Sequence, residues 1–559
     1  MRSLSKRLFW LVVFLVSAVP LAMGATISGS VKGPGGAPFE GAFVEAQNTA
    51  TSIMTDVLSQ ENGSYTIPNL AAGTYRVSIR AVGYKAAAQS ETLQTADQHA
   101  KADFALAKGA VSWSDLSVWQ AQVLLPDGPG KNLLFGQPGK NAGPCFACHD
   151  FQSRMATRRL DHQGWLGLVN YMRQDAVPYF IGPYGAFPFT NQTANEAADY
   201  LNQVFGLNST TPASPADLPG YGATVRKFGN QAMNIVYVVY PLTDPTWLSF
   251  QVYPPTIQKG LSSDGSIWVG DYGNANRVVR VNPETGENTT YNVPCPSAAG
   301  IHSAEVGPQG YVWFAEQGCN RVGRIDVKTG KVTQFQDPYV PGKEWGLRGG
   351  SKHDAHPMMV DGKLYVFASG DPATRLDPAT GKFTAIPGIP NTYDVYGDLV
   401  NGNVWFTDIG KGPLREVDPK TLKTVLSFAP SVDPTDFKSH RISITPKGVV
   451  WVTCRGDRIC SLDPKTKAFK QYTPLGPNKA DYAIQVDRAG HVWWSMSDLD
   501  TLQRLDPKTG KIVEYPFPSP EITMRKFWLD AQGRIWWASP ANATVGYFYL
   551  AGGGMHTDK

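Results

Sequence analysis

The feature that most constrains the fold is a unit that repeats seven times from Gly260 onward. Each unit contains a glycine, a bulky aromatic residue three positions later and, in most units, a turn of the DPKTG type. The aligned aromatic residues are Trp268, Trp313, Tyr365, Trp405, Trp451, Trp493 and Trp536. Short strands in units of about 40 to 50 residues are typical of a β-propeller. The repeat therefore predicts seven blades, with these aromatic side chains packed between them.

The last unit lacks an outer strand, because the sequence after VGYFYLAG does not repeat the KIVEYPFP pattern of the unit before it. The segment TWLSFQVYPP, residues 246–255, has the missing pattern and precedes the first unit. Pairing of this segment with the last blade would close the ring and remove two open sheet edges. We therefore expect a propeller over residues 246–552 with an N-terminal closing strand.

The position eight residues before each repeat glycine is polar or ionisable in six of the seven units. These residues are Ile257, His302, Asp354, Asp394, His440, Tyr482 and Arg525. In a propeller this position begins the innermost strand, so the side chains should converge at one end of the central channel. Converging imidazoles and carboxylates can ligate a transition metal or act as general acids and bases. A polar, water-filled channel without catalysis is the alternative interpretation.

Histidines are concentrated near this position, because His353 and His356 flank Asp354. The candidate ligands of a second metal ion are therefore His302, His353, His356 and His440. The six polar residues of the ring are the candidate catalytic residues. Glu316 and Asp271, which follow the aromatic strands of their blades, are secondary candidates.

The units GPQGYVWFAEQGCNRVGRIDVKTGKVTQF and VWFTDIGKGPLREVDPKTLKTV resemble the virginiamycin B (streptogramin) lyase family. The resemblance extends over about 300 residues and implies a seven-bladed propeller. It also implies a catalytic histidine at the start of the last blade and a glutamate after that blade's aromatic strand. This chain has Arg525 and Pro540 near those places, and Tyr482 instead of a histidine in the preceding blade. The departure argues against lyase activity on a streptogramin.

A second motif lies before the propeller, in NAGPCFACHDF, residues 141–151. Its Cys145-x-x-Cys148-His149 spacing suits a redox dithiol, half of a zinc site or a c-type haem. The flanks lack the preceding strand of a thioredoxin-like motif, and the segment offers no second pair of zinc ligands. We therefore predict one covalently bound haem c, attached through Cys145 and Cys148, with His149 as axial ligand of the iron.

Apolar residues at spacings of three and four predict helices in SWSDLSVWQAQVLL, WLGLVNYMRQ and NEAADYLNQVFG. The segment 110–209 resembles a short class I cytochrome c. The predicted second iron ligand is Met172, with Met155 and His162 as alternatives. Residues 210–245 are expected to be a linker.

The N-terminal 25 residues combine basic residues, a short apolar run and small residues, which predicts a signal peptide. Residues 26–108 alternate short strands and turns, and they resemble the carboxypeptidase regulatory-like domain, a transthyretin-like β-sandwich. Export favours pairing of the remaining cysteines, and their spacing suggests Cys295 with Cys319 and Cys454 with Cys460. The predicted architecture is thus multidomain and mainly β: a small sandwich, a helical cytochrome c domain and a seven-bladed propeller.

The net charge of +4 is spread along the chain without a basic tract, so we expect no nucleic-acid partner. No transmembrane anchor is expected after signal cleavage, which places the protein in the periplasm or outside the cell. The predicted function is a haem c-dependent oxidoreductase (dehydrogenase) that oxidises a small-molecule substrate at the propeller channel. Electrons would pass through the haem to a redox partner protein or a membrane electron acceptor. The alternatives are a lyase or hydrolase, and a non-catalytic electron-transfer or binding protein.

Overall fold

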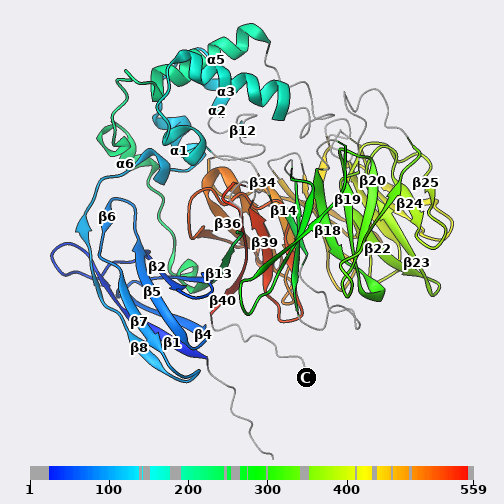
Figure 1. Ribbon diagram of the computed structural model, residues 1–559, viewed down its shortest axis with the longest axis horizontal. Coiled ribbons are helices and arrows are strands. Elements are labelled where there is room, and N and C mark those ends of the chain that lie inside the picture. Colours follow the sequence, from blue (N-terminus) through cyan, green and yellow to red (C-terminus); the bar gives the residue numbers. More distant parts are fainter. Residues whose placement is uncertain are drawn as a thin grey trace, which may run out of the picture.

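The computed structural model describes residues 24–137, 141–142, 151–176, 190–243, 249–253, 265–272, 275–296, 300–339, 352–408, 412–430, 437–454, 458–477, 481–539 and 541–551. It is mainly β, with a small sandwich beside a propeller and a helical segment over one propeller face (Figure 1). Among the described residues, no helix has the length and apolar character needed to cross a membrane.

The N-terminal unit is a β-sandwich, as the alternating pattern predicts. One sheet has the order β4-β1-β8, with β9 also paired to β1, and the other contains β3-β2-β5-β7. Apolar side chains such as Ile27, Val44, Ile67 and Val77 fill the space between the sheets. The strands are β1 (Ala25–Lys32), β2 (Phe43–Asn48), β3 (Met54–Leu58), β4 (Ser64–Leu70), β5 (Gly73–Arg80), β6 (Tyr84–Lys85), β7 (Gln89–Leu93), β8 (His99–Lys101), β9 (Phe104–Ala105) and β10 (Ala107–Lys108).

The next unit is helical, as predicted. Its helices begin at polar caps: Ser117 forms a capping box with Gln120, and the Asp161 carboxylate accepts the Gly164 N–H. Trp113, Trp165 and other apolar residues form its core. The helices are η1 (Trp113–Asp115), α1 (Val118–Leu124), α2 (Lys131–Phe135), η3 (Gln152–Ala156), α3 (His162–Tyr171), η4 (Met172–Ala176), α5 (Asn191–Phe205), η5 (Pro215–Asp217), α6 (Tyr221–Thr224) and η6 (Asn230–Asn234). A short strand pair, β11 (Gly136–Gln137) and β12 (Asn141–Ala142), lies between α2 and η3.

Six blades of the propeller are four-stranded sheets formed by strands that are consecutive in the chain. The first three are β14 (Ser249–Tyr253), β15 (Ile267–Asp271), β16 (Arg277–Val281), β17 (Asn288–Asn292); β18 (Ile301–Val306), β19 (Tyr311–Glu316), β20 (Arg321–Asp326), β21 (Val332–Gln336); and β22 (Ala355–Val360), β23 (Lys363–Ala368), β24 (Thr374–Asp377), β25 (Lys382–Ala385). The next three are β26 (Thr392–Gly397), β27 (Val404–Asp408), β28 (Leu414–Val417), β29 (Thr424–Phe428); β30 (Ser439–Ile444), β31 (Val450–Cys454), β32 (Arg458–Leu462), β33 (Phe469–Tyr472); and β34 (Asp481–Val486), β35 (Val492–Met496), β36 (Thr501–Leu505), β37 (Ile512–Pro516).

The last blade closes with a different strand from the one predicted. Strands β38 (Trp528–Leu529), β39 (Ile535–Ser539) and β40 (Thr544–Leu550) are completed by β13 (Ile235–Pro241), which pairs along β40. The assignment of residues 246–255 to this role is wrong, because β14 from that segment is the innermost strand of the first blade. The prediction of a linker over 210–245 is also wrong, because β13 lies within these residues and completes the last blade.

Strand β13 also pairs with β3 of the sandwich, so the last blade and one sandwich sheet form a continuous eight-stranded sheet. Its apolar sequence IVYVVYP fits a strand that has neighbours along both edges and is buried from Ile235 to Tyr240. The sandwich is therefore joined to the propeller by backbone hydrogen bonds as well as by the chain.

The repeated tryptophans pack between blades, as predicted. Trp268, Trp313, Trp405 and Trp536 are at most 1% exposed, so the repeat position belongs to the propeller core. The two predicted cysteine pairs are also confirmed, with Cα–Cα distances of 6.2 Å for Cys295–Cys319 and 6.1 Å for Cys454–Cys460.

Candidate functional site

The innermost strands bring most of the predicted polar ring together at one end of the channel. Nδ1 of His302 lies 3.3 Å from Oδ1 of Asp354. Lys526 Nζ, beside the predicted Arg525, donates to Asp394 Oδ1 at 2.7 Å and to Asp354 Oδ2 at 3.2 Å. These contacts join four blades. We call the group the mouth cluster, and its members are His302, His353, Asp354, Tyr393, Asp394, His440, Arg441, Tyr482, Arg525 and Lys526.

Arg441, which the repeat position did not predict, lies at the centre of the mouth cluster and is 1% exposed. Its guanidinium donates to Asp354 Oδ2 at 3.2 Å, to the Tyr393 hydroxyl at 3.2 Å and to the Arg525 carbonyl at 3.0 Å. Asp394 Oδ2 lies 3.7 Å away. One side chain thus connects the residues of four blades.

Tyr393, Arg441 and Lys526 each adjoin a predicted residue in the chain. For Tyr393 and Arg441, backbone geometry explains how two consecutive side chains reach the mouth cluster. The ladder is irregular near the start of four inner strands, between Ile301 and Ser303 in β18, Thr392 and Val395 in β26, Ser439 and Ile442 in β30, and Asp481 and Ile484 in β34. A bulge sets two residues against one, so consecutive side chains can reach one region. Strict alternation along a strand hides this possibility.

Aromatic and imidazole rings form a continuous row across the mouth cluster. Ring centroids are 5.5 Å apart for His302 and Tyr393, 4.6 Å for Tyr393 and His440, and 4.4 Å for His440 and Tyr482. The hydroxyls of Tyr393 and Tyr482 are hydrogen bonded to each other. The guanidinium of Arg525 lies over the Tyr482 ring at 4.4 Å, a favourable cation–π distance.

The three histidines of the mouth cluster are held neutral at physiological pH. Burial, then the charges of Arg441 and Lys526, place the pKa of His302 well below its usual value. Burial and Arg441 do the same to the pKa of His440, with Arg525 adding to the effect. Burial and the neighbouring His302 lower the pKa of His353. His302 and His353 are almost fully covered, whereas His440 and Tyr482 are partly exposed.

The two carboxylates of the mouth cluster differ although both are buried. For Asp354 burial raises the pKa, but the charges of Lys526 and Arg441 prevail, so the net shift is downward. For Asp394 burial and the nearby Asp354 prevail, and the pKa is raised. Three cations, Arg441, Arg525 and Lys526, thus face two carboxylates, which favours an anionic ligand at the partly exposed surface.

A repeated hydroxyl group fixes the backbone of the mouth cluster. The Thr407 hydroxyl accepts the Asp394 N–H at 2.9 Å and donates to the His440 carbonyl of the next blade at 2.8 Å. The same pairing is made by Ser369 between Asp354 and Tyr393, Thr453 between Arg441 and Tyr482, and Ser495 between Ala483 and Met524. A Ser or Thr near the end of the aromatic strand is a sequence signal that could have been found.

Several predicted site residues lie elsewhere. The prediction that His356 joins the other histidines is wrong. His356 lies in β22, two residues after Asp354, and its Nδ1 is 2.9 Å from Glu305. Its ring stacks on Tyr396 of β26. Asp271 pairs with Arg277 at 2.8 Å. Ile257 lies outside the described residues, as does Pro540.

Glu316 lies at the end of β19 and is fully buried. One of its oxygens accepts Gln334 Nε2 at 2.8 Å. Burial raises the pKa of Glu316 to about 7, partly opposed by the Gln334 hydrogen bond and the charge of Arg321.

The four histidines predicted to hold a second metal ion do not form one ligand set among the described residues. Within the described residues, no group of three or more His, Cys, Asp or Glu side chains is arranged to hold a metal ion. The cations beside His302 and His440 also oppose a bound metal. The mouth cluster therefore fits proton chemistry better than metal ligation.

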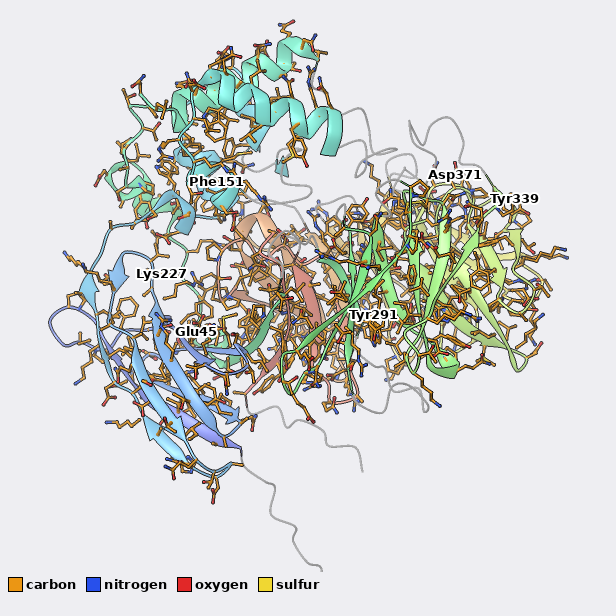
Figure 2. The ribbon with its side chains drawn as sticks, in the orientation of Figure 1. Glu45, Phe151, Lys227, Tyr291, Tyr339 and Asp371 are labelled. Atoms are coloured by element: carbon orange, nitrogen blue, oxygen red, sulfur yellow. A yellow bond between two sulfur atoms is a disulfide. The ribbon has the colours of Figure 1, made fainter. Side chains whose placement is uncertain are left out.

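The motif Cys145-x-x-Cys148-His149 lies outside the described residues. The helix that follows it, η3, contacts the propeller: the Ser153 N–H donates to Glu521 Oε1 at 2.5 Å. Helix α1 also contacts η9 (Ser497–Leu499) of the propeller. This short helix follows Met496, which pairs with Asp481 at the start of the inner strand β34, one residue before Tyr482 of the mouth cluster. The helical segment therefore contacts the last two blades at the end of the propeller where the mouth cluster lies. Figure 2 labels Phe151, which precedes η3 and belongs to the buried core of the helical segment.

The residues described near the motif fit a haem. Trp165 Nε1, Arg154 Nε and Gln152 Oε1 are buried without a hydrogen-bond partner in the described structure. Two of them are donors suited to the carboxylates that a haem carries. Of the candidate iron ligands, Met155 is buried in the helical core, Met172 is partly exposed, and His162 is paired with Asp199 at 3.2 Å. The two methionines remain candidates for the second axial position.

Comparison with known proteins identifies one of the three units by a family match. Residues 26–107 match the carboxypeptidase regulatory-like domain, as predicted for the sandwich. No curated protein matches the chain. Similar solved structures include a streptogramin B lyase with 19% identity, covering 57% of this chain and 99% of that chain, at a TM-score of 0.48. The virginiamycin B lyase of Staphylococcus aureus has 18% identity, 56% and 99% coverage and a TM-score of 0.47. At these values the likeness carries no inference about activity, and these findings provide no support for a haem.

Proposed function

We propose that the protein is an exported haem c-dependent oxidoreductase that oxidises a small anionic substrate at the mouth cluster. One observation carries the proposal: the helical segment that bears the Cys145-x-x-Cys148-His149 motif rests on the propeller face where the mouth cluster lies. Electron transfer requires a donor and an acceptor to be close, and the contacts between the described helices and this end of the propeller support such closeness. A haem would serve no purpose in a hydrolase or a lyase.

The substrate class follows from charge and exposure. Arg525 is held over the Tyr482 ring, and both residues border the partly exposed imidazole of His440. The excess of cations over carboxylates attracts a carboxylate or another anion to this place. An anion that carries an oxidisable hydroxyl group would then lie against a neutral imidazole.

Substrate binding would also activate the base. In the free protein, burial and the neighbouring cations keep the pKa of His440 low, so the imidazole is neutral but weakly basic. A bound anion offsets those cations and raises the pKa of the imidazole. His440 can then accept the hydroxyl proton, while the second proton, from the carbon, passes to solvent as the carbonyl forms. Two electrons leave the substrate.

A haem c held by Cys145, Cys148 and His149 would supply a one-electron acceptor, from which electrons would pass to a redox partner protein or a membrane electron acceptor. Tyr393 and Arg441 hold the row of rings in place, and Asp354 and Asp394 hold Arg441 and Lys526. These residues position the site, whereas His440 and Tyr482 are the partly exposed groups that a substrate can reach, and the buried Arg525 supplies positive charge beside Tyr482.

The test is substrate-dependent reduction of the purified full-length haem protein. Small hydroxy acids are screened for an increase in the visible absorbance of reduced haem c. We expect His440→Gln and Arg525→Gln each to slow reduction by about 100-fold or more without altering the haem spectrum. The matched control is His491→Gln, which removes an imidazole that pairs with Asp487 away from the cluster. Absence of covalent haem from the wild-type protein, or reduction at the wild-type rate in His440→Gln, would refute the proposal.

A lyase is the second candidate, because a neutral imidazole beside cations also suits removal of a proton next to a carbonyl group. Such a reaction moves no electrons to an acceptor. Cys145→Ser with Cys148→Ser separates the two candidates: a lyase keeps product formation without haem, whereas the oxidoreductase loses it.

A further inference from the structure

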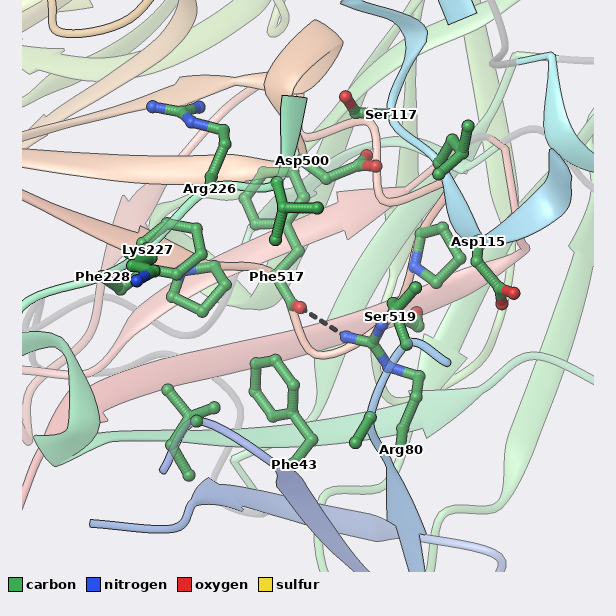
Figure 3. Close-up of a pocket in the computed structure, with 18 of the residues that line it drawn as sticks. Phe43, Arg80, Asp115, Ser117, Arg226, Lys227, Phe228, Asp500, Phe517 and Ser519 are labelled. Atoms are coloured by element: carbon green, nitrogen blue, oxygen red, sulfur yellow. Dashed lines mark hydrogen bonds between the residues drawn. The ribbon is translucent and has the colours of Figure 1, made fainter. Parts of the chain in front are cut away.

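A cavity of about 550 Å³ lies where the sandwich, the helical segment and the propeller meet. Phe43 and Arg80 line it from the sandwich, Asp115 and Arg226 from the helical segment, and Asp500 and Phe517 from the propeller. Figure 3 shows these residues around the cavity. Its volume is within the range of about 300–1,000 Å³ that is usual for small-molecule sites, which often lie between domains.

We propose that this cavity binds a small amphipathic anion, with an aromatic or alicyclic body and one acidic group. The site is separate from the mouth cluster and from the proposed oxidoreductase reaction. The apolar body would lie among Phe43, Met233 and Phe517, and the acidic group would lie at Arg226 and Lys227.

The apolar part of the cavity is formed against buried core side chains. Phe43, Met233 and Phe517 are each at most 4% exposed and belong to the core shared by the sandwich and the last blades. Aromatic and aliphatic walls of this kind make up most of the surface that a small ligand contacts. They select an apolar body of limited size.

The charged groups of the cavity are unevenly distributed. Figure 3 shows Arg226 and Lys227 on one side, Asp115 on the opposite side and Asp500 between them. Arg80, on the acidic side, is already committed, since it donates to the Pro518 carbonyl at 2.6 Å and to the Phe517 carbonyl at 2.8 Å. The side of Arg226 and Lys227 is therefore the one that can receive an anion.

Arg226 offers a donor to such an anion. Its Nη2 is paired with Glu514, whereas Nη1 is buried and has no hydrogen-bond partner in the described structure. A buried donor without a partner is unfavourable, and an acidic group is the acceptor that suits a guanidinium best. The neighbouring Lys227 is exposed and adds a second positive charge.

The test uses 1-anilinonaphthalene-8-sulfonate, an aromatic anion whose fluorescence increases in apolar sites, with the full-length native protein. We expect one saturable site per chain by calorimetry, with binding weakened about tenfold in Arg226→Gln, the loss typical of one charge-assisted hydrogen bond. Ser519→Trp, which fills the cavity, should abolish binding. The matched control Lys420→Gln removes an exposed, ion-paired cation on another blade and should change nothing.

A second measurement keeps the test decisive if a variant folds poorly. Far-ultraviolet circular dichroism and haem content establish that each variant is folded before binding is measured. Binding of the probe at several equivalent sites, or equal affinity of wild-type, Arg226→Gln and Ser519→Trp proteins, would overturn the proposal. The readout does not involve haem reduction, so it is independent of the oxidoreductase proposal.

Discussion

The walls between blades and the channel mouth are built from the same repeat but use it in opposite ways. At the walls, one position holds a large aromatic residue in every unit, and the side chains Trp268, Trp313 and Trp405 are fully buried. At the mouth, one position is polar or ionisable in six of the seven units but varies in residue type, and the residues there and beside it bond to one another across blades. Repetition thus specifies the fold, and departure from repetition at one ring creates a site.

The largest loss of stability is expected from the wall. Trp405→Ala removes a fully buried side chain between two blades, and truncation of a buried aromatic residue costs about 3 to 5 kcal/mol. Urea denaturation followed by tryptophan fluorescence measures the change. Leu399→Ala, at a position that is 87% exposed, is the control and should alter the free energy of unfolding by less than about 0.5 kcal/mol. Equal effects of the two variants would contradict the assignment of Trp405 to the wall.

Removal of a single charge from the mouth cluster should cost about as much folding stability as truncation of a wall tryptophan. Asp354→Asn leaves Arg441 and Lys526 with less compensation, and breaking a buried ion pair costs about 3 to 5 kcal/mol. Adding Lys526→Met to that variant removes one of the uncompensated cations and should recover part of the loss. A double-mutant cycle in urea measures this coupling. Strictly additive effects would show that the two side chains do not interact.

The two disulfides of the propeller close loops of different length. Cys295–Cys319 closes a loop with a sequence separation of 24 and Cys454–Cys460 one of 6. Loop-closure entropy then predicts losses of about 3 and about 2 kcal/mol when the paired cysteines are replaced by serine. Thermal denaturation of the two double variants gives the order. A larger loss for the Cys454–Cys460 variant would exclude the entropic explanation.

The wall was predictable from sequence and the mouth only partly so, for physical reasons. The recurrence of Trp405 and its equivalents in the alignment identifies core without any knowledge of the chain path. The closing strand was misassigned because 235–241 and 246–255 both have strand patterns, and only β13 pairing with β40 and β3 decides between them. His302, Asp354 and Asp394 were found from their repeat position, whereas Arg441 was missed because irregular pairing in β30 is a property of the backbone.

Glu316, at the end of a wall strand, introduces a pH dependence that the tryptophans lack. Its pKa is about 7 in the folded protein and 4.5 as the reference value, so the folded state holds the proton more tightly. Stability should therefore fall as pH rises from about 4.5 to about 7, by up to about 3 kcal/mol, and then stay constant. Glu316→Gln should remove this term, so that the variant is the more stable protein at pH 8. Parallel pH profiles of the two proteins would refute the raised pKa.

The smallest effect on stability should accompany the largest effect on function. His440 is partly exposed and neutral, so His440→Gln removes neither a buried charge nor a large apolar volume, and the free energy of unfolding should change by less than about 1 kcal/mol. Reduction of the haem by substrate should nevertheless slow by about 100-fold. Urea denaturation and stopped-flow absorbance on the same preparation give both quantities. If His440→Gln lowered stability by as much as Trp405→Ala, His440 would have a structural role in the channel. Wall and mouth residues would then differ in chemical type but not in their role.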